Sequence, residues 1–175
     1  MENLLNQAAQ ILKNSRHAVV FTGAGISVES GVPPFRGDGG LWNKYDPRSL
    51  ELSYFLKNPK ESWTVLKEIF YDFLADARPN PAHLALALLE NEGIVKSVIT
   101  QNIDNLHQIA GNTLVYEFHG NTRQLRCLEC GRTILSESVS LNSLPPRCNL
   151  CQGWLKPDIV FFGEMIPPGV REQAF

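Results

Sequence analysis

The sequence predicts an α/β domain with a mostly parallel sheet and a small cysteine-bearing module inserted near its C-terminal end. Three observations lead to this fold class: short apolar runs alternate with stretches of helical periodicity, Gly and Pro stand at the junctions, and the composition becomes polar and cysteine-bearing over residues 123–156. Wholly apolar runs are typical of strands buried on both faces, which occur where helices connect parallel strands.

Periodicity places the individual elements along the chain. We expect a helix over 3–14, a fully buried strand over 17–23, and a glycine-rich turn and loop over 23–36. An aromatic loop over 41–46, held down by Trp42 and Tyr45, should be followed by helices over 60–77 and 79–93. A strand over 95–100, a short helix capped by Gly111 and a strand over 113–120 are expected next. After the cysteine-bearing segment, residues 157–164 are expected to form a strand, and a helix begins near the C-terminus.

Composition limits the classes of partner. The chain has 175 residues, 19% of them charged, and a net charge of -2, which argues against a broad basic face for nucleic acid or an anionic membrane. No apolar run approaches the roughly 18 residues that span a bilayer, and the N-terminus lacks the basic-then-apolar pattern of a signal peptide. We therefore expect a cytoplasmic protein without direct nucleic-acid or membrane partners.

The four cysteines form two C-x-x-C pairs, Cys127 with Cys130 and Cys148 with Cys151, separated by 17 residues. Two such pairs can supply four thiolates to one tetrahedral Zn²⁺, and four sulfur ligands leave no open position for water. The spacing therefore predicts a structural zinc site. Two disulfides and redox-active pairs are the alternatives, and a reducing compartment disfavours the disulfides.

The turn Gly23-Ala24-Gly25 follows an apolar run and fits a loop that approaches a phosphate closely. Position 28, where a dinucleotide-binding loop has its third glycine, is Val28, so an ordinary tight turn is equally compatible with the glycines. Further along, Arg36 offers a guanidinium for a phosphate or ribose, and Phe35 offers a ring that either covers a planar ligand or belongs to the core.

Polar side chains follow two expected strands. Gln101, Asn102 and Asp104 come directly after one strand, at the edge of the sheet where ligands of open α/β folds bind. Helix capping alone accounts for one of these residues but not for all three. His119 follows the next strand, where its imidazole either acts as a general base or has a structural role. Structural roles suffice for the other histidines.

Together these segments resemble the sirtuin family of NAD-dependent protein deacylases. The resemblance covers nearly the whole chain and is carried, in family order, by GAGISVESGVPPFRG, TQNIDNLH, FHG, the two C-x-x-C pairs and PDIVFFGE. It implies a Rossmann-like NAD-binding domain made of residues 1–121 and 157–175, with a zinc-binding module over residues 122–156.

The resemblance also implies the roles of individual residues. NAD would contact Gly23, Ala24, Gly25, Ile26, Phe35, Arg36, Gln101, Asn102, Asp104 and His119. Among these, His119, Asn102 and Asp104 would serve catalysis, with His119 as the general base. An acylated-lysine peptide would pair by strand addition with Val160, Phe161, Phe162, Gly163 and Glu164.

The implied activity is NAD-dependent protein-lysine deacetylation. The acyl group would pass from lysine to ADP-ribose, and nicotinamide would be released. NAD hydrolysis or ADP-ribosyl transfer, and a non-catalytic zinc-stabilised module that binds peptides, are the alternatives. We align Leu66 and Ile69 with the positions where relatives that prefer succinyl groups carry Tyr and Arg, so a neutral acyl group is expected.

The family's sheet continues beyond the FFGE segment, whereas this chain ends at Phe175. The parallel sheet is therefore expected to be incomplete. We expect the sequence to be a fragment of a longer protein, with completion of the sheet by another chain as the alternative, and we expect the activity of the 175 residues alone to be weak or absent.

Overall fold

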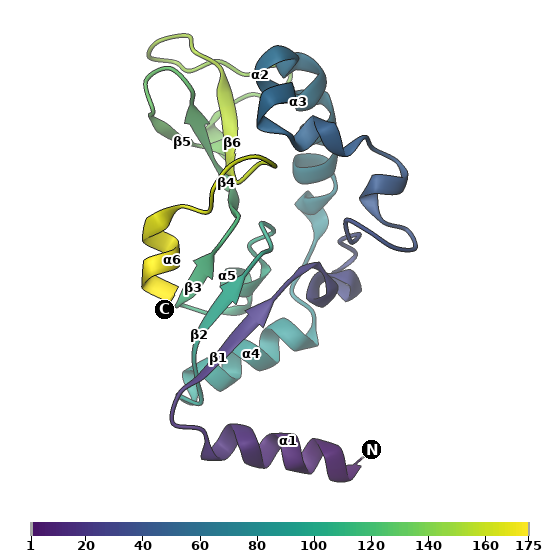
Figure 1. Ribbon diagram of the computed structural model, residues 1–175, viewed down its shortest axis with the longest axis vertical. Helices are drawn as coiled ribbons and strands as arrows, with labels where there is room; N and C mark the ends of the chain where they lie inside the picture. Colours follow the sequence, from purple (N-terminus) through teal and green to yellow (C-terminus); the bar gives the residue numbers. More distant parts are fainter. Residues whose placement is uncertain (1, 175) are drawn as a thin grey trace.

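Two three-stranded sheets, one parallel and one antiparallel, follow each other along the long axis of the computed structural model, which describes residues 2–174 (Figure 1). The parallel sheet has the order β1-β2-β3 and consists of β1 (Ala18–Thr22), β2 (Val95–Thr100) and β3 (Val115–Glu117). The predicted strand over 95–100 is confirmed, and its strand neighbours on both sides explain its almost complete burial.

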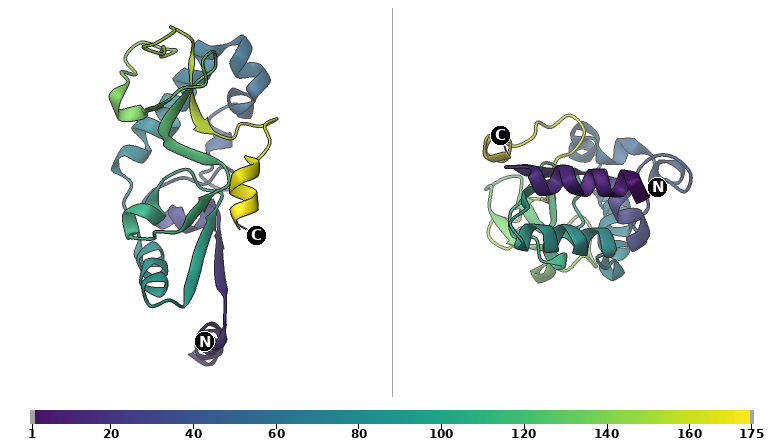
Figure 2. Two further views of the ribbon diagram at one scale, coloured as in Figure 1. Left: turned by 90° about the vertical axis from the view of Figure 1, so that its left-hand side faces the viewer. Right: turned by 90° about the horizontal axis from the view of Figure 1, so that it is seen from below.

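Helices α4 (Pro81–Asn91) and α5 (Leu106–Ala110) lie on one face of the parallel sheet (Figure 2). Asn80 caps α4, since its side chain accepts hydrogen bonds from the backbone N–H groups of Ala82 and His83, and Pro81 fits the first helical position. Helix α5 ends at Gly111, as the sequence predicts. Asn80 therefore marks the start of α4, and Gly111 marks the end of α5.

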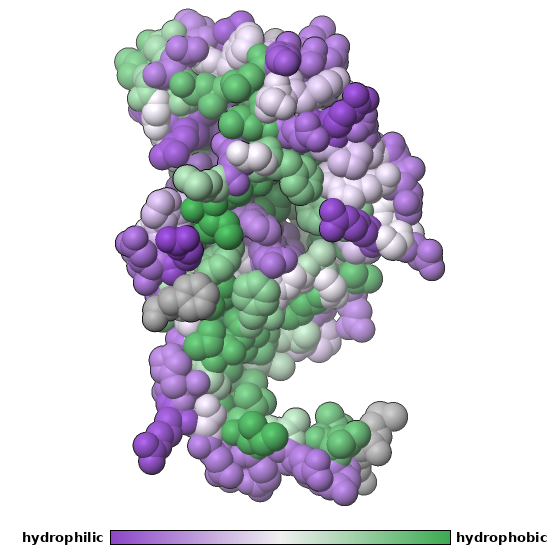
Figure 3. Space-filling view, in the orientation of Figure 1, coloured by the Kyte–Doolittle hydropathy of each residue, from purple (hydrophilic) through white to green (hydrophobic). Residues whose placement is uncertain are grey.

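The opposite side of the parallel sheet corrects one expectation. The sequence predicts full burial of the first strand, but Val19 and Phe21 in β1 are 42% and 60% exposed. Helix α1 (Glu2–Asn14) lies beyond the end of the sheet rather than on this face (Figures 1 and 2). An apolar surface extends over this part of the molecule and along α1 (Figure 3), because no helix of the described residues covers β1 there.

The antiparallel sheet has the order β5-β4-β6 and consists of β4 (Gly120–Cys127), β5 (Thr133–Leu135) and β6 (Leu155–Ile159). The expected strand over 157–164 is therefore wrong in its bounds, since β6 starts earlier and ends at Ile159. It pairs antiparallel with β4 and is not a strand of the parallel sheet. Residues 160–164 continue as a connection that ends in a turn at Gly163.

Helices α2 (Leu52–Lys57) and α3 (Pro59–Lys67) pack against this second sheet and form the main core. Trp63 is fully buried, and its indole N–H donates to the carbonyl oxygen of Leu155 at 2.8 Å. The expected helix over 60–77 is interrupted, because α3 is followed by a π-helical turn (Glu68–Asp72) and a 3-10 turn (Leu74–Asp76). Helix α2 was not anticipated from the sequence.

The remaining elements are short. The expected loop after Gly23 contains a 3-10 helix (Ala24–Ser30), further 3-10 turns cover Leu41–Asn43, Pro47–Leu50 and Ser136–Ser138, and α6 spans Pro168–Ala174. Trp42 and Tyr45 pack against the core, as expected for the aromatic loop. Within residues 2–174, no helix combines the length and hydropathy needed to cross a membrane.

Candidate active site and metal centre

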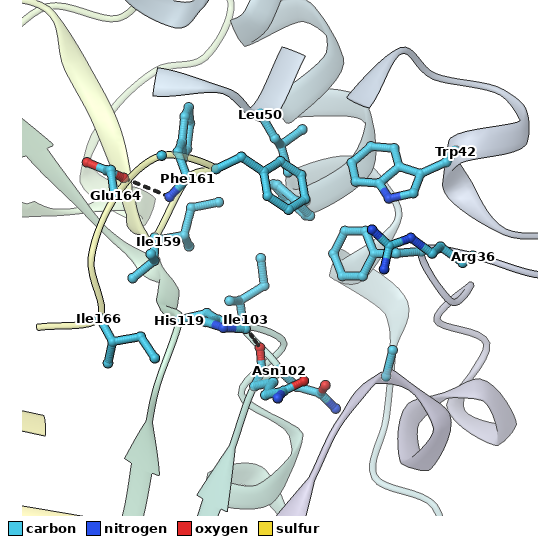
Figure 4. A pocket seen from close by; sticks show the side chains of 17 residues that line it. Arg36, Trp42, Leu50, Asn102, Ile103, His119, Ile159, Phe161, Glu164 and Ile166 are labelled. Atoms are coloured by element: carbon cyan, nitrogen blue, oxygen red, sulfur yellow. Dashed lines mark hydrogen bonds between the residues drawn. The ribbon is translucent and has the colours of Figure 1, made fainter. Parts of the chain in front are cut away.

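A cavity of about 380 Å³ opens between the two sheets, at the carboxyl ends of β1 and β2 (Figure 4). This edge is where open parallel sheets bind ligands, and the volume lies within the range of small-molecule sites. Of the residues singled out from the sequence, the cavity is lined by Ala24, Phe35, Arg36, Gln101, Asn102, His119 and all five residues of 160–164. Segments far apart in the chain therefore meet at one site.

Other predicted residues stand outside this lining. Asp104 borders a smaller neighbouring cavity of about 30 Å³, together with Ala24, Phe35 and Asn102. Gly23, Gly25 and Ile26 line neither of these two cavities. The apolar wall also includes residues that the sequence did not indicate as ligand-binding: Trp42, Leu50, Phe70, Ile103, Ile159 and Ile166.

His119 lies in the cavity wall, where the chain passes from β3 to β4. Its Nδ1 is 2.9 Å from the carbonyl oxygen of Gln101. A carbonyl oxygen only accepts, so Nδ1 carries the proton in the neutral ring and Nε2 keeps its lone pair. Gly120 follows with φ +72°, and a Cβ at this position would overlap the carbonyl oxygen of Asp158. The local backbone therefore demands glycine directly after the histidine.

A buried serine joins the glycine-rich turn to the loop after β2. Ser27 is fully buried, and its hydroxyl donates to Asp104 Oδ2 at 2.6 Å. The Asn102 side-chain amide donates to Ser27 Oγ and to the carbonyl oxygen of Gly23, both at 3.1 Å. Asp104 Oδ1 accepts from the N–H of Leu106 at 3.0 Å. Sequence reasoning missed Ser27, although it lies within the GAGIS stretch that drew attention.

Aromatic side chains cover the cavity on the side of Arg36 (Figure 4). The rings of Phe35 and Trp42 have centroids 5.3 Å apart, and Trp42 lies 6.2 Å from Phe162. Arg36 is the one lysine or arginine among the described residues that line this cavity.

The helical segment over 59–76 contributes Phe70 to the cavity, while Leu66 is buried in the core and Ile69 borders the smaller cavity. None of these side chains carries a positive charge. The residues of this segment that border the two cavities are therefore apolar.

Residues 160–164 form the opposite wall and are held by backbone hydrogen bonds. The N–H of Val160 donates to the carbonyl oxygen of His119 at 2.8 Å. Phe162 donates to the carbonyl oxygen of Leu50 at 2.9 Å and accepts from the N–H of Leu52 at 3.1 Å. This segment thus connects the histidine to the loop that precedes α2.

The four cysteine sulfurs lie within 4.8 Å of one another, which brings both predicted C-x-x-C pairs to one point. The Cys127 and Cys151 sulfurs are 3.4 Å apart, and those of Cys130 and Cys148 are 3.9 Å apart. Zn–S bonds of about 2.3 Å in a tetrahedron place sulfurs about 3.8 Å apart, so the arrangement fits one Zn²⁺.

The surroundings of the sulfurs also suit a metal. Backbone N–H groups of Cys151 and Leu150 lower the pKa of the Cys148 thiol to about 7, which favours the thiolate that a metal requires. The Gly153 N–H lowers the pKa of Cys151, but contacts with the other three thiols outweigh this effect and raise that pKa to about 12. A side chain at Gly153 would collide with Glu129 and with the sulfur of Cys127. Thiolate chemistry and close packing therefore agree with a closed structural site.

His83 and His107 are both buried, so the structural roles expected for them stay a prediction that is compatible with their burial. Their rings lie 4.9 Å apart between α4 and α5, and His107 Nε2 is 2.9 Å from Thr22 Oγ1. Burial lowers the pKa of both imidazoles. Neither side chain is among the residues that line the cavity.

Comparison with known proteins agrees with this geometry. The model of the Sir2 family matches residues 23–174. The chain belongs to the Sir2 family. It is 47% identical over 172 residues to NAD-dependent protein deacetylase 2 of Caldanaerobacter subterraneus subsp. tengcongensis, an alignment that covers 95% of this chain and 68% of the relative.

A second Sir2-family relative is NAD-dependent protein deacylase 2 of Archaeoglobus fulgidus, with 49% identity over 95% of this chain and 67% of the relative. Among solved structures, Sir2 in complex with a p53 peptide and NAD+ superposes with a TM-score of 0.88 at 38% identity, covering 97% of this chain and 69% of that one. The present chain thus spans about two thirds of the length of these sirtuins.

Proposed function

We propose that this sirtuin chain carries the catalytic and peptide-binding residues of an NAD-dependent protein-lysine deacylase, with neutral acyl groups such as acetyl as substrates. The observation that carries the proposal is His119, whose Nε2 is unprotonated in the neutral ring and which lines one cavity together with Asn102 and residues 160–164. The related proteins are named NAD-dependent deacetylases and deacylases, and one neighbour binds both a peptide and NAD+.

NAD, when bound, supplies the ribose to which the acyl group is transferred and nicotinamide as the leaving group. We propose that His119 Nε2 accepts a proton from a ribose hydroxyl. Asn102 and Asp104, held through Ser27, would orient the ligand beside the glycine-rich turn, which is formed by Gly23, Ala24, Gly25 and Ile26.

The rest of the cavity has roles in ligand binding. Phe35, Arg36 and Gln101 would contact the co-substrate, and the apolar wall would hold the acyl chain and exclude water from the reacting carbon. An extended acyl-lysine peptide would pair with the backbone of residues 160–164.

The cysteine cluster has a supporting role in this proposal. Cys127, Cys130, Cys148 and Cys151 would hold a structural Zn²⁺ within a module over residues 122–156, and residues 1–121 and 157–175 would form the NAD-binding part. Four unpaired thiols gathered for metal also support a reducing compartment, so we propose a cytoplasmic location.

Nicotinamide release from NAD tests the proposal, measured with and without an acetyl-lysine peptide. Release that requires the peptide and is lost in His119→Ala is expected, at a low rate for these 175 residues alone. A zinc-loaded, folded Lys60→Met protein serves as the matched control, because Lys60 is exposed and outside the cavity. Release without the peptide would instead identify NAD hydrolysis or ADP-ribosyl transfer, and absence of release from the folded protein would favour a non-catalytic peptide-binding role.

A further inference from the structure

Lys156 in β6 is a buried charge that the proposed reaction does not use. It is 6% exposed, and no other Lys, Arg, Asp or Glu of the described residues is buried. Removing an ammonium group from water costs several kcal/mol unless partners compensate. Lys156 does not line the cavity of the active site. The groups that Lys156 contacts therefore indicate which part of the structure it stabilises.

All of these partners belong to the chain that directly follows Lys156. Its Nζ donates to the carbonyl oxygens of Ile159 at 2.7 Å and of Pro157 at 3.3 Å. It lies 2.9 Å from Glu164 Oε2 and 4.2 Å from the centre of the Phe161 ring. The ammonium group of Lys156 thus contacts both backbone carbonyl oxygens and side chains within residues 157–164.

Glu164 connects Lys156 to the backbone of the same segment. The Oε2 atom that faces Lys156 also accepts the N–H of Phe161 at 2.7 Å (Figure 4). The Glu164 N–H donates in turn to the carbonyl oxygen of Phe161 at 3.0 Å. The Glu164 carboxylate, 27% exposed, is therefore bound to its own segment, and it closes the turn over 161–164.

We propose that Lys156 is a positioning residue which, through Glu164, holds residues 160–164 in the conformation that pairs with the acylated peptide, without touching peptide or NAD. This inference rests on the proposed function. The other backbone bonds of the segment hold Val160 and Phe162, whereas the Lys156–Glu164 pair holds Phe161 and the turn that follows. Strand addition depends on a preformed edge, since ordering a flexible segment upon binding lowers affinity.

Two substitutions each remove one partner of the Lys156–Glu164 ion pair. Lys156→Met keeps the aliphatic length and removes the ammonium group, and Glu164→Gln keeps an acceptor for the Phe161 N–H. The matched control is Lys67→Met, because Lys67 pairs with Asp72 on the surface of the helical segment, away from the cavity. Because the two groups act as one unit, the double variant is expected to lose little more than either single variant.

The first measurement is steady-state nicotinamide release at varied peptide and varied NAD. We expect the KM for an acetyl-lysine peptide to rise about tenfold in Lys156→Met, equivalent to about 1.4 kcal/mol, while the KM for NAD changes by less than about twofold. An unchanged peptide KM in folded, zinc-loaded protein would overturn the inference, as would an equal rise in both KM values.

The second measurement is amide hydrogen exchange by mass spectrometry, which needs no activity. Exchange within residues 157–166 is expected to accelerate in Lys156→Met and in Glu164→Gln, but not in Lys67→Met. If Lys156→Met does not fold, the near-isosteric Glu164→Gln decides the matter by the same two readouts. If the wild-type chain releases no nicotinamide with peptide, the proposed function fails, and unchanged exchange in the variants would separately overturn the positioning role.

Discussion

Ser27→Ala is expected to destabilise the fold by about 2 kcal/mol, or about 30-fold in the folding equilibrium. The substitution deletes a fully buried hydroxyl that donates to Asp104 at 2.6 Å and accepts from Asn102 at 3.1 Å. A hydrogen bond to a charged group contributes about 1.5–3 kcal/mol and a neutral one about 1 kcal/mol. The loss is partial because Asp104 keeps the N–H of Leu106 and Asn102 keeps the carbonyl oxygen of Gly23.

Urea unfolding followed by tryptophan fluorescence measures this change, and the KM for NAD is expected to rise in the same variant because the loop bearing Asn102 loosens. Ser30→Ala is the matched control. Ser30 lies in the same 3-10 helix, and its buried hydroxyl has no hydrogen-bond partner within residues 2–174. Its removal should leave stability unchanged or slightly improved. If both variants unfold within about 0.5 kcal/mol of each other, the reasoning from the hydrogen-bond network is refuted.

Three further outcomes are expected. Chelation of the metal, or Cys148→Ser, should abolish cooperative thermal unfolding, because structural zinc contributes on the order of 10 kcal/mol in small domains; metal analysis finding no zinc in folded protein would contradict this. The free energy of unfolding should fall as the pH drops below about 6.5. Burial lowers the pKa of His83 and His107, so the unfolded chain binds protons at a higher pH than the folded chain does. The urea midpoint should therefore change less with pH in His107→Asn than in the wild-type chain. Trp63→Phe should cost about 1–3 kcal/mol in urea unfolding by leaving the carbonyl oxygen of Leu155 unpaired, and an unchanged midpoint would show that water or another donor replaces the indole.

Local features of the site were predictable because they depend on neighbours in the chain. The spacing of the two C-x-x-C pairs, the strand over 95–100 and the end of α5 at Gly111 all follow from residue type and short-range geometry. Polar residues that directly follow parallel strands also had to gather at one edge of the sheet, which is where Asn102 and His119 meet. These properties do not depend on how distant parts of the chain pack.

Tertiary structure decided which atoms meet. Ser27 and Asp104 are 77 positions apart in the sequence, and no local sequence pattern predicts their hydrogen bond. The apolar run over 157–164 reads as one strand, yet pairing with β4 ends β6 at Ile159 and leaves residues 160–164 to form a cavity wall. The buried Lys156, which composition would place at the surface, is stable only because Glu164 and two carbonyl groups surround it.

By itself, then, the sequence determined some of the local elements, the ligand set of the metal site and the edge of the sheet where the polar residues collect. The directions of the side chains at that edge were decided only when the two sheets and α3 packed together. Backbone preferences act over a few residues, whereas the partner of a buried polar atom is selected by close packing and by the cost of leaving that atom unpaired.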